Sequence, residues 1–249
     1  MAKKDRIDKL IFERGFAPSR ERAQAYIMAG KVLVGTQKID KPGQKFPVNC
    51  EIRILGEDQP YVSRGGLKLA KAIQQFNIEV KNRVAMDIGA STGGFTDCLL
   101  QNQASFVFAV DSGTNQLDWK LISNSRVKNM EKCNFRHLTM ADIGTHVDLA
   151  VIDVSFISLT KILGNCYRFL VKGGQVIALI KPQFEAGRDQ VKKGGLVNDT
   201  EIHHEVVETI KRHAESIGFA CKALDKSPIQ GKKSGNREFL IHLEKPHSR

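Results

Sequence analysis

Four ionisable side chains in this chain have types and positions that could move a proton. Lys181 closes the apolar run 178–180, which is unusual because a buried ammonium group is costly without a partner. Asp153 ends another apolar run, and Glu238 lies in the last one. With Lys68, from an earlier helix, they form a set of two amines and two acids. If they meet at one rim of a sheet, they could act as general acid or base.

The elements that position such a site start with the segment 84–97. Residues 84–88 form a short apolar run that suits a strand buried on both faces. A loop of small residues follows, in which glycines allow tight turns and a close approach of the backbone to a ligand. A helix then starts near Phe95. This layout is typical of a nucleotide or nucleoside site at the carboxyl end of the first strand of an open α/β sheet.

Two interpretations of this loop meet obstacles. The dinucleotide fingerprint G-x-G-x-x-G requires a second glycine where this chain has Ser91. Residues 89–93 also match the G-x-S-x-G nucleophile elbow, which needs a downstream acid and then a histidine in loops. Asp153 could be that acid, but the candidate histidines fall in an apparent helix or strand (His203, His204 and His242).

The third interpretation is S-adenosylmethionine (SAM), which has no pyrophosphate and needs acids for its ammonium group and ribose hydroxyls. Asp87 lies at the end of the first strand, and Asp111 ends the next apolar strand, where a ribose would be held. The end of the third strand, near Glu131, is where an adenine is expected. The residues predicted to bind SAM are Asp87, Gly89, Ala90, Ser91, Gly93, Gly94, Phe95, Asp111 and Glu131.

The composition indicates an ordinary globular protein with a polyanionic partner. The 249 residues are 41% hydrophobic and 26% charged, which is ordinary for a globular chain. No apolar stretch reaches the length of a membrane span, and the N-terminus lacks a secretory signal. Five scattered cysteines show no metal-ligand or disulfide spacing, which favours a reduced cytoplasm and predicts no metal. The net charge of +11 favours a polyanionic partner, nucleic acid first.

The first 58 residues are predicted to form a small α+β domain. Helices are expected at 5–16 and 20–28, a hairpin at 31–39 and a last strand at 51–55. A polar segment ending in proline follows, so residues 59–66 are interpreted as a linker.

Residues 67–249 are predicted to form an α/β domain. Strands alternate with helices, which implies a doubly wound sheet of seven strands whose last two form an antiparallel edge pair. The expected strands are 84–88, 105–111, 126–131, 147–153, 175–181, 219–224 and 237–243, and the expected helices are 67–76, 94–102, 114–123, 159–170 and 199–217.

The N-terminal region resembles the small RNA-binding fold named after the fourth small-subunit ribosomal protein. The resemblance rests on the segments 6–10, 19–23, 29–34 and 41–43. In that family the second helix and the following loop present basic residues to structured RNA. The resemblance implies RNA contacts by Arg6, Arg20, Arg22 and Lys31, and Arg64 of the linker is added to the predicted RNA-binding residues.

Nearly the whole chain resembles the TlyA family of ribosomal RNA 2′-O-methyltransferases, within the FtsJ-like group. The resemblance rests on Lys68, Asp153, Lys181 and Glu238, with the motifs at 63–66 and 154–159. It implies a Rossmann-like class I SAM-dependent methyltransferase sheet after the RNA-binding domain, with ribosomal RNA or a ribosomal subunit as substrate.

In that family the four residues surround a ribose 2′-hydroxyl, of a cytidine, that attacks the SAM methyl group. Lys181 would accept the hydroxyl proton or hold the developing alkoxide, with Asp153 orienting the amine. Glu238 would position Lys68 or the ribose. The family is also called haemolysin, so a membrane-active protein is one alternative; a non-catalytic RNA-binding or ribosome assembly factor is another. The target nucleotide, the subunit and the oligomeric state stay open.

Overall fold

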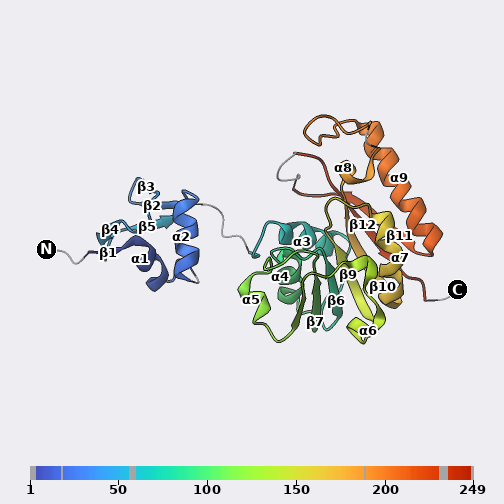
Figure 1. Ribbon diagram of the computed structural model, residues 1–249, viewed down its shortest axis with the longest axis horizontal. Helices are drawn as coiled ribbons and strands as arrows, with labels where there is room; N and C mark the ends of the chain where they lie inside the picture. Colours follow the sequence, from blue (N-terminus) through green and yellow to red (C-terminus); the bar gives the residue numbers. More distant parts are fainter. Residues whose placement is uncertain (1–3, 18, 56–59, 188, 230–234, 248–249) are drawn as a thin grey trace. The chain divides into compact units, whose positions relative to one another are not determined.

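The computed structural model describes residues 4–17, 19–55, 60–187, 189–229 and 235–247. The chain divides into two compact units, Met1–Gln59 and Pro60–Arg249 (Figure 1). The predicted end of the first domain, at residue 58, lies outside the described residues. From Pro60 onward the chain packs on the larger unit, because the Val62 amide donates to Asp97 Oδ2 at 2.9 Å and the Gln101 side chain donates to the Pro60 carbonyl at 2.7 Å.

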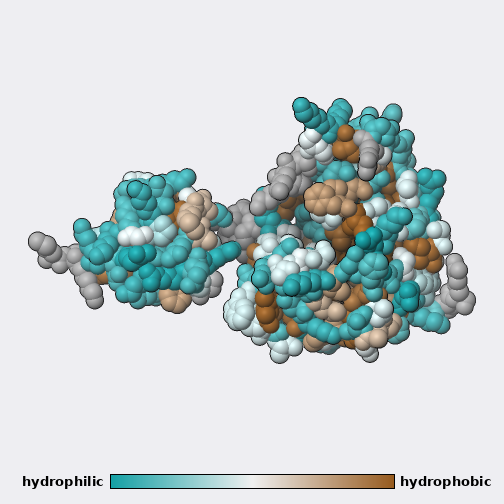
Figure 2. Space-filling view, viewed as in Figure 1, coloured by the Kyte–Doolittle hydropathy of each residue, from teal (hydrophilic) through white to brown (hydrophobic). Residues whose placement is uncertain are grey.

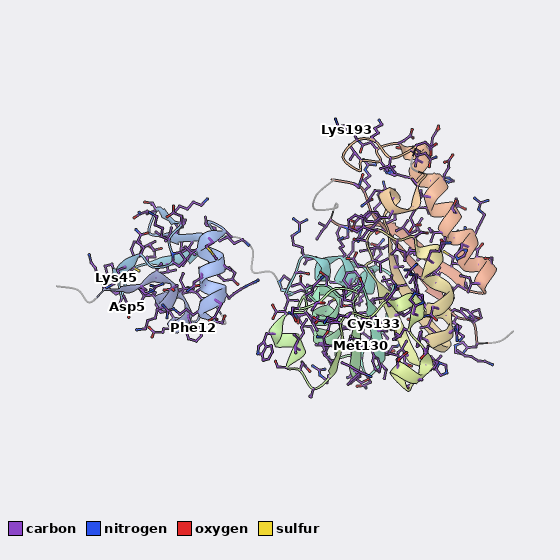
Figure 3. The ribbon with its side chains drawn as sticks, viewed as in Figure 1. Asp5, Phe12, Lys45, Met130, Cys133 and Lys193 are labelled. Atoms are coloured by element: carbon purple, nitrogen blue, oxygen red, sulfur yellow. The ribbon has the colours of Figure 1, made fainter. Side chains whose placement is uncertain are left out.

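The small unit packs two helices on short antiparallel strands. Strand β2 pairs with both β3 and β5, and β1 pairs with β4. The elements are β1 (Lys4–Arg6), α1 (Ile7–Glu13), α2 (Arg20–Met28), β2 (Val32–Val34), β3 (Gln37–Ile39), β4 (Lys45–Pro47) and β5 (Ile52–Ile54). The helix expected at 5–16 therefore starts later, because the residues before Ile7 are extended and pair with β4, as the neighbouring labels Asp5 and Lys45 in Figure 3 indicate.

A buried carboxylate ties the small unit together. Asp8 is fully buried, and its oxygens accept hydrogen bonds from the Arg6 guanidinium at 3.0 Å, the Arg20 Nε at 3.2 Å and the Gln24 amide at 2.8 Å. These donors outweigh the effect of burial and hold the pKa of the Asp8 carboxyl well below its usual range. The ionised carboxylate thus links the start of α1 to α2.

The larger unit contains the predicted seven-stranded sheet, with the order β11-β12-β10-β9-β6-β7-β8. All neighbours are parallel except β12, which runs antiparallel to both β10 and β11, so the predicted antiparallel edge pair is confirmed. The strands are β6 (Val84–Ile88), β7 (Phe106–Val110), β8 (Val127–Met130), β9 (Val147–Ile152), β10 (Leu170–Ile180), β11 (Ala220–Lys226) and β12 (Phe239–Glu244).

Helices cover both faces of this sheet, as a doubly wound fold requires (Figure 1). One face carries α3 (Gly65–Gln75), α4 (Gly94–Gln101) and α5 (Trp119–Ile122). The other carries α6 (Met140–Ile143), α7 (Leu163–Phe169) and α9 (Thr200–Ile217). Short turns complete the unit: 3-10 turns Phe135–His137 and Leu159–Lys161, and helix α8 (Pro182–Glu185).

Two expected helices are shorter than predicted. The expected helix 114–123 is reduced to α5, because the loop before it turns back and the Asp118 carboxylate caps the helix through the Lys120 amide at 3.0 Å. The expected helix 159–170 divides into a 3-10 turn and α7, and its last residue starts β10. No helix among the described residues is long and apolar enough to cross a membrane.

Most of the visible surface of the larger unit is hydrophilic, with brown and tan atoms gathered towards the middle of this face (Figure 2). Among the described residues of this unit, the large apolar side chains that stay exposed are Trp119, Ile122, Phe156 and Leu224. Two of them, Trp119 and Phe156, are aromatic.

We predict that Asp8→Ala lowers the free energy of unfolding of the small unit by about 2 kcal/mol, the scale of hydrogen bonds to a charged group. Because the pKa of Asp8 is depressed in the folded state, its stabilisation is present above the ordinary carboxyl pKa and is lost as the pH falls below about 4. Hydrogen exchange of the small unit across this pH range measures both effects. Asp40→Ala, at an exposed carboxylate, is the control; equal destabilisation by both variants would contradict the prediction.

Candidate active site

Two buried lysine–carboxylate pairs form the centre of the site. The Lys68 Nζ lies 2.5 Å from Glu238 Oε2, and the Lys181 Nζ lies 2.5 Å from Asp153 Oδ1. Lys68, Lys181 and Glu238 are only 9%, 8% and 4% exposed, whereas Asp153 is half-buried. The structure therefore pairs each predicted amine with one predicted acid.

The sheet explains why residues so distant in sequence converge. Asp153 directly follows β9, and Lys181 directly follows its parallel neighbour β10, so both lie at the carboxyl rim of the sheet. Ile180 pairs with Phe239 of the antiparallel β12, so Glu238, which precedes β12, lies at this rim as well. Helix α3 packs on the sheet through Leu69 and Ala72 and adds Lys68.

The Lys181 amine is held from two sides. Besides its ion pair with Asp153, its Nζ donates to the Ser155 Oγ at 3.1 Å. An ammonium group has three donors. Among the described residues these two are the polar partners of Lys181 Nζ, which leaves one donor position for a substrate oxygen.

A pocket of about 490 Å³ opens at the same rim, beyond β6, β7, β8 and β9. Asp153 lies in its wall, so the Lys181–Asp153 pair borders the pocket. Figure 3 marks the position of the Cys133 wall residue beside Met130, at the end of β8. The other lining residues are Ile88, Gly89, Ser91, Val110, Asp111, Ser112, Gln116, Asn134, Phe135, Arg136, Val154, Ser155, Phe156, Ile157 and Ile162.

The loop after β6 has a backbone that demands glycine at Gly89. Its φ is +87°, and a Cβ there would lie 2.6 Å from the Asp153 carbonyl oxygen. Ser91 is also left-handed, at +47°, and its amide donates to Asp111 Oδ2 at 2.8 Å. Asp111 accepts a second amide bond, from Gly113, at 2.7 Å. The loop and the Asp111 carboxylate thus hold each other in the pocket wall.

Asp87 is fully buried below this loop. The Thr96 hydroxyl donates to its Oδ2 at 2.7 Å, while Oδ1 has no hydrogen-bond partner among the described residues. Burial, reinforced by the nearby carboxylates of Asp153 and Asp111, raises the pKa of Asp87 to about 7. Three carboxylates therefore surround this end of the pocket, a field that suits a cationic ligand.

The remaining residues predicted to bind SAM support the pocket wall from behind. Ala90 and Phe95 are buried, and a Cβ on Gly93 or Gly94 would meet Leu121 or Ser63. Glu131 lies outside the wall, where its carboxylate accepts the Gln116 amide at 3.1 Å. Beyond β8 the wall is formed instead by residues 133–136.

The sequence prediction did not include several residues of the pocket wall. Phe156 is 91% exposed and has a left-handed φ of +63°, and its ring packs at a tilt of 50° against Phe184, with ring centroids 4.9 Å apart. Gln116 and Arg136 also line the pocket. Phe156 lies within the motif 154–159, which carried the family resemblance without a role for this ring. The signal of Gln116 and Arg136 is a position shortly after a strand end, which does not tell a wall residue from a solvated one.

The predicted RNA-contact residues divide into two groups. Arg6 and Arg20 bind the buried Asp8, so part of their role is structural. Arg22, Lys31 and Arg64 are exposed, and the Arg22 guanidinium lies 5.3 Å from the centre of the Tyr26 ring. Among the described residues no group of three or more His, Cys, Asp or Glu is placed to hold a metal ion.

The site fits SAM on three observations: a pocket at the carboxyl ends of β6 and β7, a backbone cradle at Gly89 that a Cβ would fill, and an unpartnered buried carboxylate oxygen on Asp87. Asp111 in the pocket wall is the residue that we expect to hold the ribose hydroxyls, and the three acids would suit the ammonium and sulfonium charges. The doubly wound sheet with this site defines a class I SAM-dependent methyltransferase.

Comparison with known protein families supports this class of enzyme. Residues 61–245 match the FtsJ-like methyltransferase family, and residues 5–52 match the S4 domain. The chain therefore belongs to the FtsJ-like methyltransferase family, with SAM as its cofactor, and carries an S4 RNA-binding domain.

Individual relatives extend over nearly the whole chain. The Bacillus subtilis protein YqxC, named as a candidate rRNA methyltransferase, is 48% identical over 98% of this chain and 87% of its own length. The 16S/23S rRNA (cytidine-2′-O)-methyltransferase TlyA of Mycobacterium tuberculosis is 38% identical over 98% of this chain and 91% of its own. A solved structure of a candidate haemolysin from Streptococcus thermophilus is 50% identical, with a TM-score of 0.76 over 100% of this chain and 90% of that one. These relatives show that the chain belongs to the TlyA family.

We predict that Gly89→Ala weakens SAM binding at least about tenfold, because the added Cβ collides with the Asp153 carbonyl oxygen and displaces the pocket wall. Gly144→Ala is the matched control: its φ is also positive, +78°, but nothing lies within 4 Å of the new Cβ. Titration calorimetry with SAM measures both. Equal affinity in the two variants would show that the close approach at Gly89 does not shape the pocket.

The pKa of Asp87, about 7, makes SAM binding depend on pH. The cationic ligand favours the ionised carboxylate, so binding releases a proton, and the affinity for SAM rises with pH up to about 7 and then levels. Because this folded-state pKa lies above the ordinary 3.8, the free protein loses stability as the pH rises from about 4 towards 7. Calorimetry in buffers of different ionisation enthalpy counts the proton. Asp87→Asn should abolish both trends; if it does not, another group titrates.

Proposed function

We propose that this chain transfers the methyl group of SAM to the 2′-oxygen of a ribose, at a cytidine, in ribosomal RNA in the cytoplasm. The observation that carries the proposal is the pair of buried lysine–carboxylate contacts beside the cofactor pocket. The relatives named as rRNA methyltransferases support the substrate class, and the S4 domain supports a structured RNA.

In this proposal SAM supplies an activated methyl group, and the chain holds the sugar. The ribose hydroxyl takes the position at the Lys181 Nζ that Asp153 and Ser155 leave open. From there Lys181 accepts the hydroxyl proton as the methyl group arrives, or donates to the oxygen and stabilises the negative charge that develops on it. Asp153 and Ser155 fix the amine in place, while Glu238 orients Lys68 towards the same ribose.

The target base needs its own support, because a ribose inside a folded RNA reaches a pocket only when its nucleotide leaves the stack. Phe156 offers an exposed aromatic face on the pocket wall, backed by Phe184. Its left-handed backbone stores strain of the kind that gathers at functional sites. We propose that the Phe156 ring stacks on the target cytosine.

We predict that Lys181→Met lowers methyl transfer by about a hundredfold or more, the usual contribution of a positioned acid–base group. Methionine keeps the length of the buried stem and removes the amine, so binding of SAM and of rRNA should persist. Mass mapping of 2′-O-methyl groups in rRNA measures transfer, with Lys161→Ala, at an exposed lysine, as the control. Full activity of Lys181→Met would remove Lys181 from the mechanism; loss of activity in both variants would deny it a specific role.

A further inference from the structure

An exposed tryptophan in the catalytic unit is not used by the mechanism above. Trp119, the one tryptophan of the sequence, is 75% exposed, whereas tryptophan is highly buried on average. Ile122, one helical turn further along α5, is 37% exposed. Because residues three apart lie on the same side of a helix, the two side chains form one small apolar patch.

This patch stands on a rigid support that belongs to the cofactor pocket. Leu121 of α5 is fully buried and packs against Gly93 of the cofactor loop. The Asp118 amide donates to the Thr92 carbonyl of the same loop at 3.1 Å, and the Asp118 carboxylate caps α5. The indole is therefore presented by a fixed element rather than by a loose loop, so little further ordering is needed on binding.

Two cations follow the indole along the chain. The Lys120 side chain is 65% exposed and pairs with Asp97 at 3.2 Å. Arg126, exposed and just before β8, donates to the Ala104 carbonyl at 3.1 Å and has no carboxylate partner among the described residues. The nearby acids are engaged: Asp97 is buried and binds Lys120 and the Val62 amide, and Asp118 caps α5. A further acid, Glu131, accepts the Gln116 amide.

We propose that Trp119 stacks on an unpaired base of the RNA substrate, with Lys120 and Arg126 at the adjacent phosphates. Exposed aromatic rings beside cations are the usual platform for single-stranded RNA, since every base has a stacking face. The chain's net charge of +11 favours a polyanion such as RNA over a second, equally basic copy, and the exposed indole adds the stacking face that a base requires. This inference rests on the proposed function, and it adds a contact outside the S4 domain.

The lone tryptophan makes the test direct, because all tryptophan fluorescence comes from Trp119. In the free full-length chain, acrylamide should quench this fluorescence readily. Addition of protein-free 16S and 23S rRNA, which contain no tryptophan, should shift the emission and protect it from acrylamide, while SAM alone should not. Protection already present in the free chain would overturn the inference, because the S4 unit or a second copy would then cover the ring.

Substitutions separate stacking from mere proximity. Trp119→Leu should weaken rRNA binding about tenfold, the scale of one stacked base, whereas Trp119→Phe keeps a stacking face and should stay close to the parent chain. Affinity for SAM should not change in either variant. Leu224→Ala, at another exposed apolar residue of this unit, is the control and should bind rRNA normally.

The outcomes distinguish this inference from the function beneath it. If Trp119→Leu binds and methylates rRNA as the parent chain does, Trp119 is not a contact, while the proposed function stands. If the parent chain itself neither binds nor methylates rRNA, both the proposed function and the inference about Trp119 are wrong. Trp119→Phe failing as badly as Trp119→Leu, with SAM binding intact, would also overturn stacking.

Discussion

The constraint on which the site depends is the cost of burying ammonium groups. Lys68 and Lys181 lie almost out of contact with water, and each needs a carboxylate at close range. The sheet supplies those carboxylates from the end of β9 and from the segment before β12. Without the reversal of the last strand, a residue preceding a strand would lie at the opposite rim, so the antiparallel edge is a condition for the second pair.

The cofactor side of the site differs, because carboxylates rather than ammonium groups gather there. Asp111 and Asp153 line one end of the pocket, with Arg136 as the cation among the lining residues, and Asp87 is buried below them. Burial, reinforced by the two neighbouring carboxylates, raises the pKa of Asp87 to about 7. The free protein bears the repulsion among the three carboxylates, and a cationic cofactor relieves it. Stability of the free chain and affinity for its cofactor therefore oppose each other at the same three residues.

Much of this could be predicted from sequence, for identifiable reasons. Buried strands appear as apolar runs, and an ionisable residue that interrupts such a run is conspicuous, which is how Asp153 and Lys181 were found. The pairing of Asp153 with Lys181, and of Glu238 with Lys68 or the ribose, came from the family resemblance. The apolar runs alone could not supply it, because pairing depends on strand order. Arg6 and Arg20 looked like free cations, since nothing in a helical pattern reveals that Asp8 is buried beneath them. Phe156 and the short α5 depend on loop conformations that have no periodic signal.

The pair Lys68–Glu238 joins residues 170 positions apart in the chain. During synthesis the S4 unit and most of the sheet are made before β12. The ion pair between Lys68 and Glu238 therefore cannot form until the segment with Glu238 has been synthesised. The pair is thus among the last contacts of this unit to become possible. A chain cut before Glu238 would keep the S4 unit and leave Lys68 without its carboxylate.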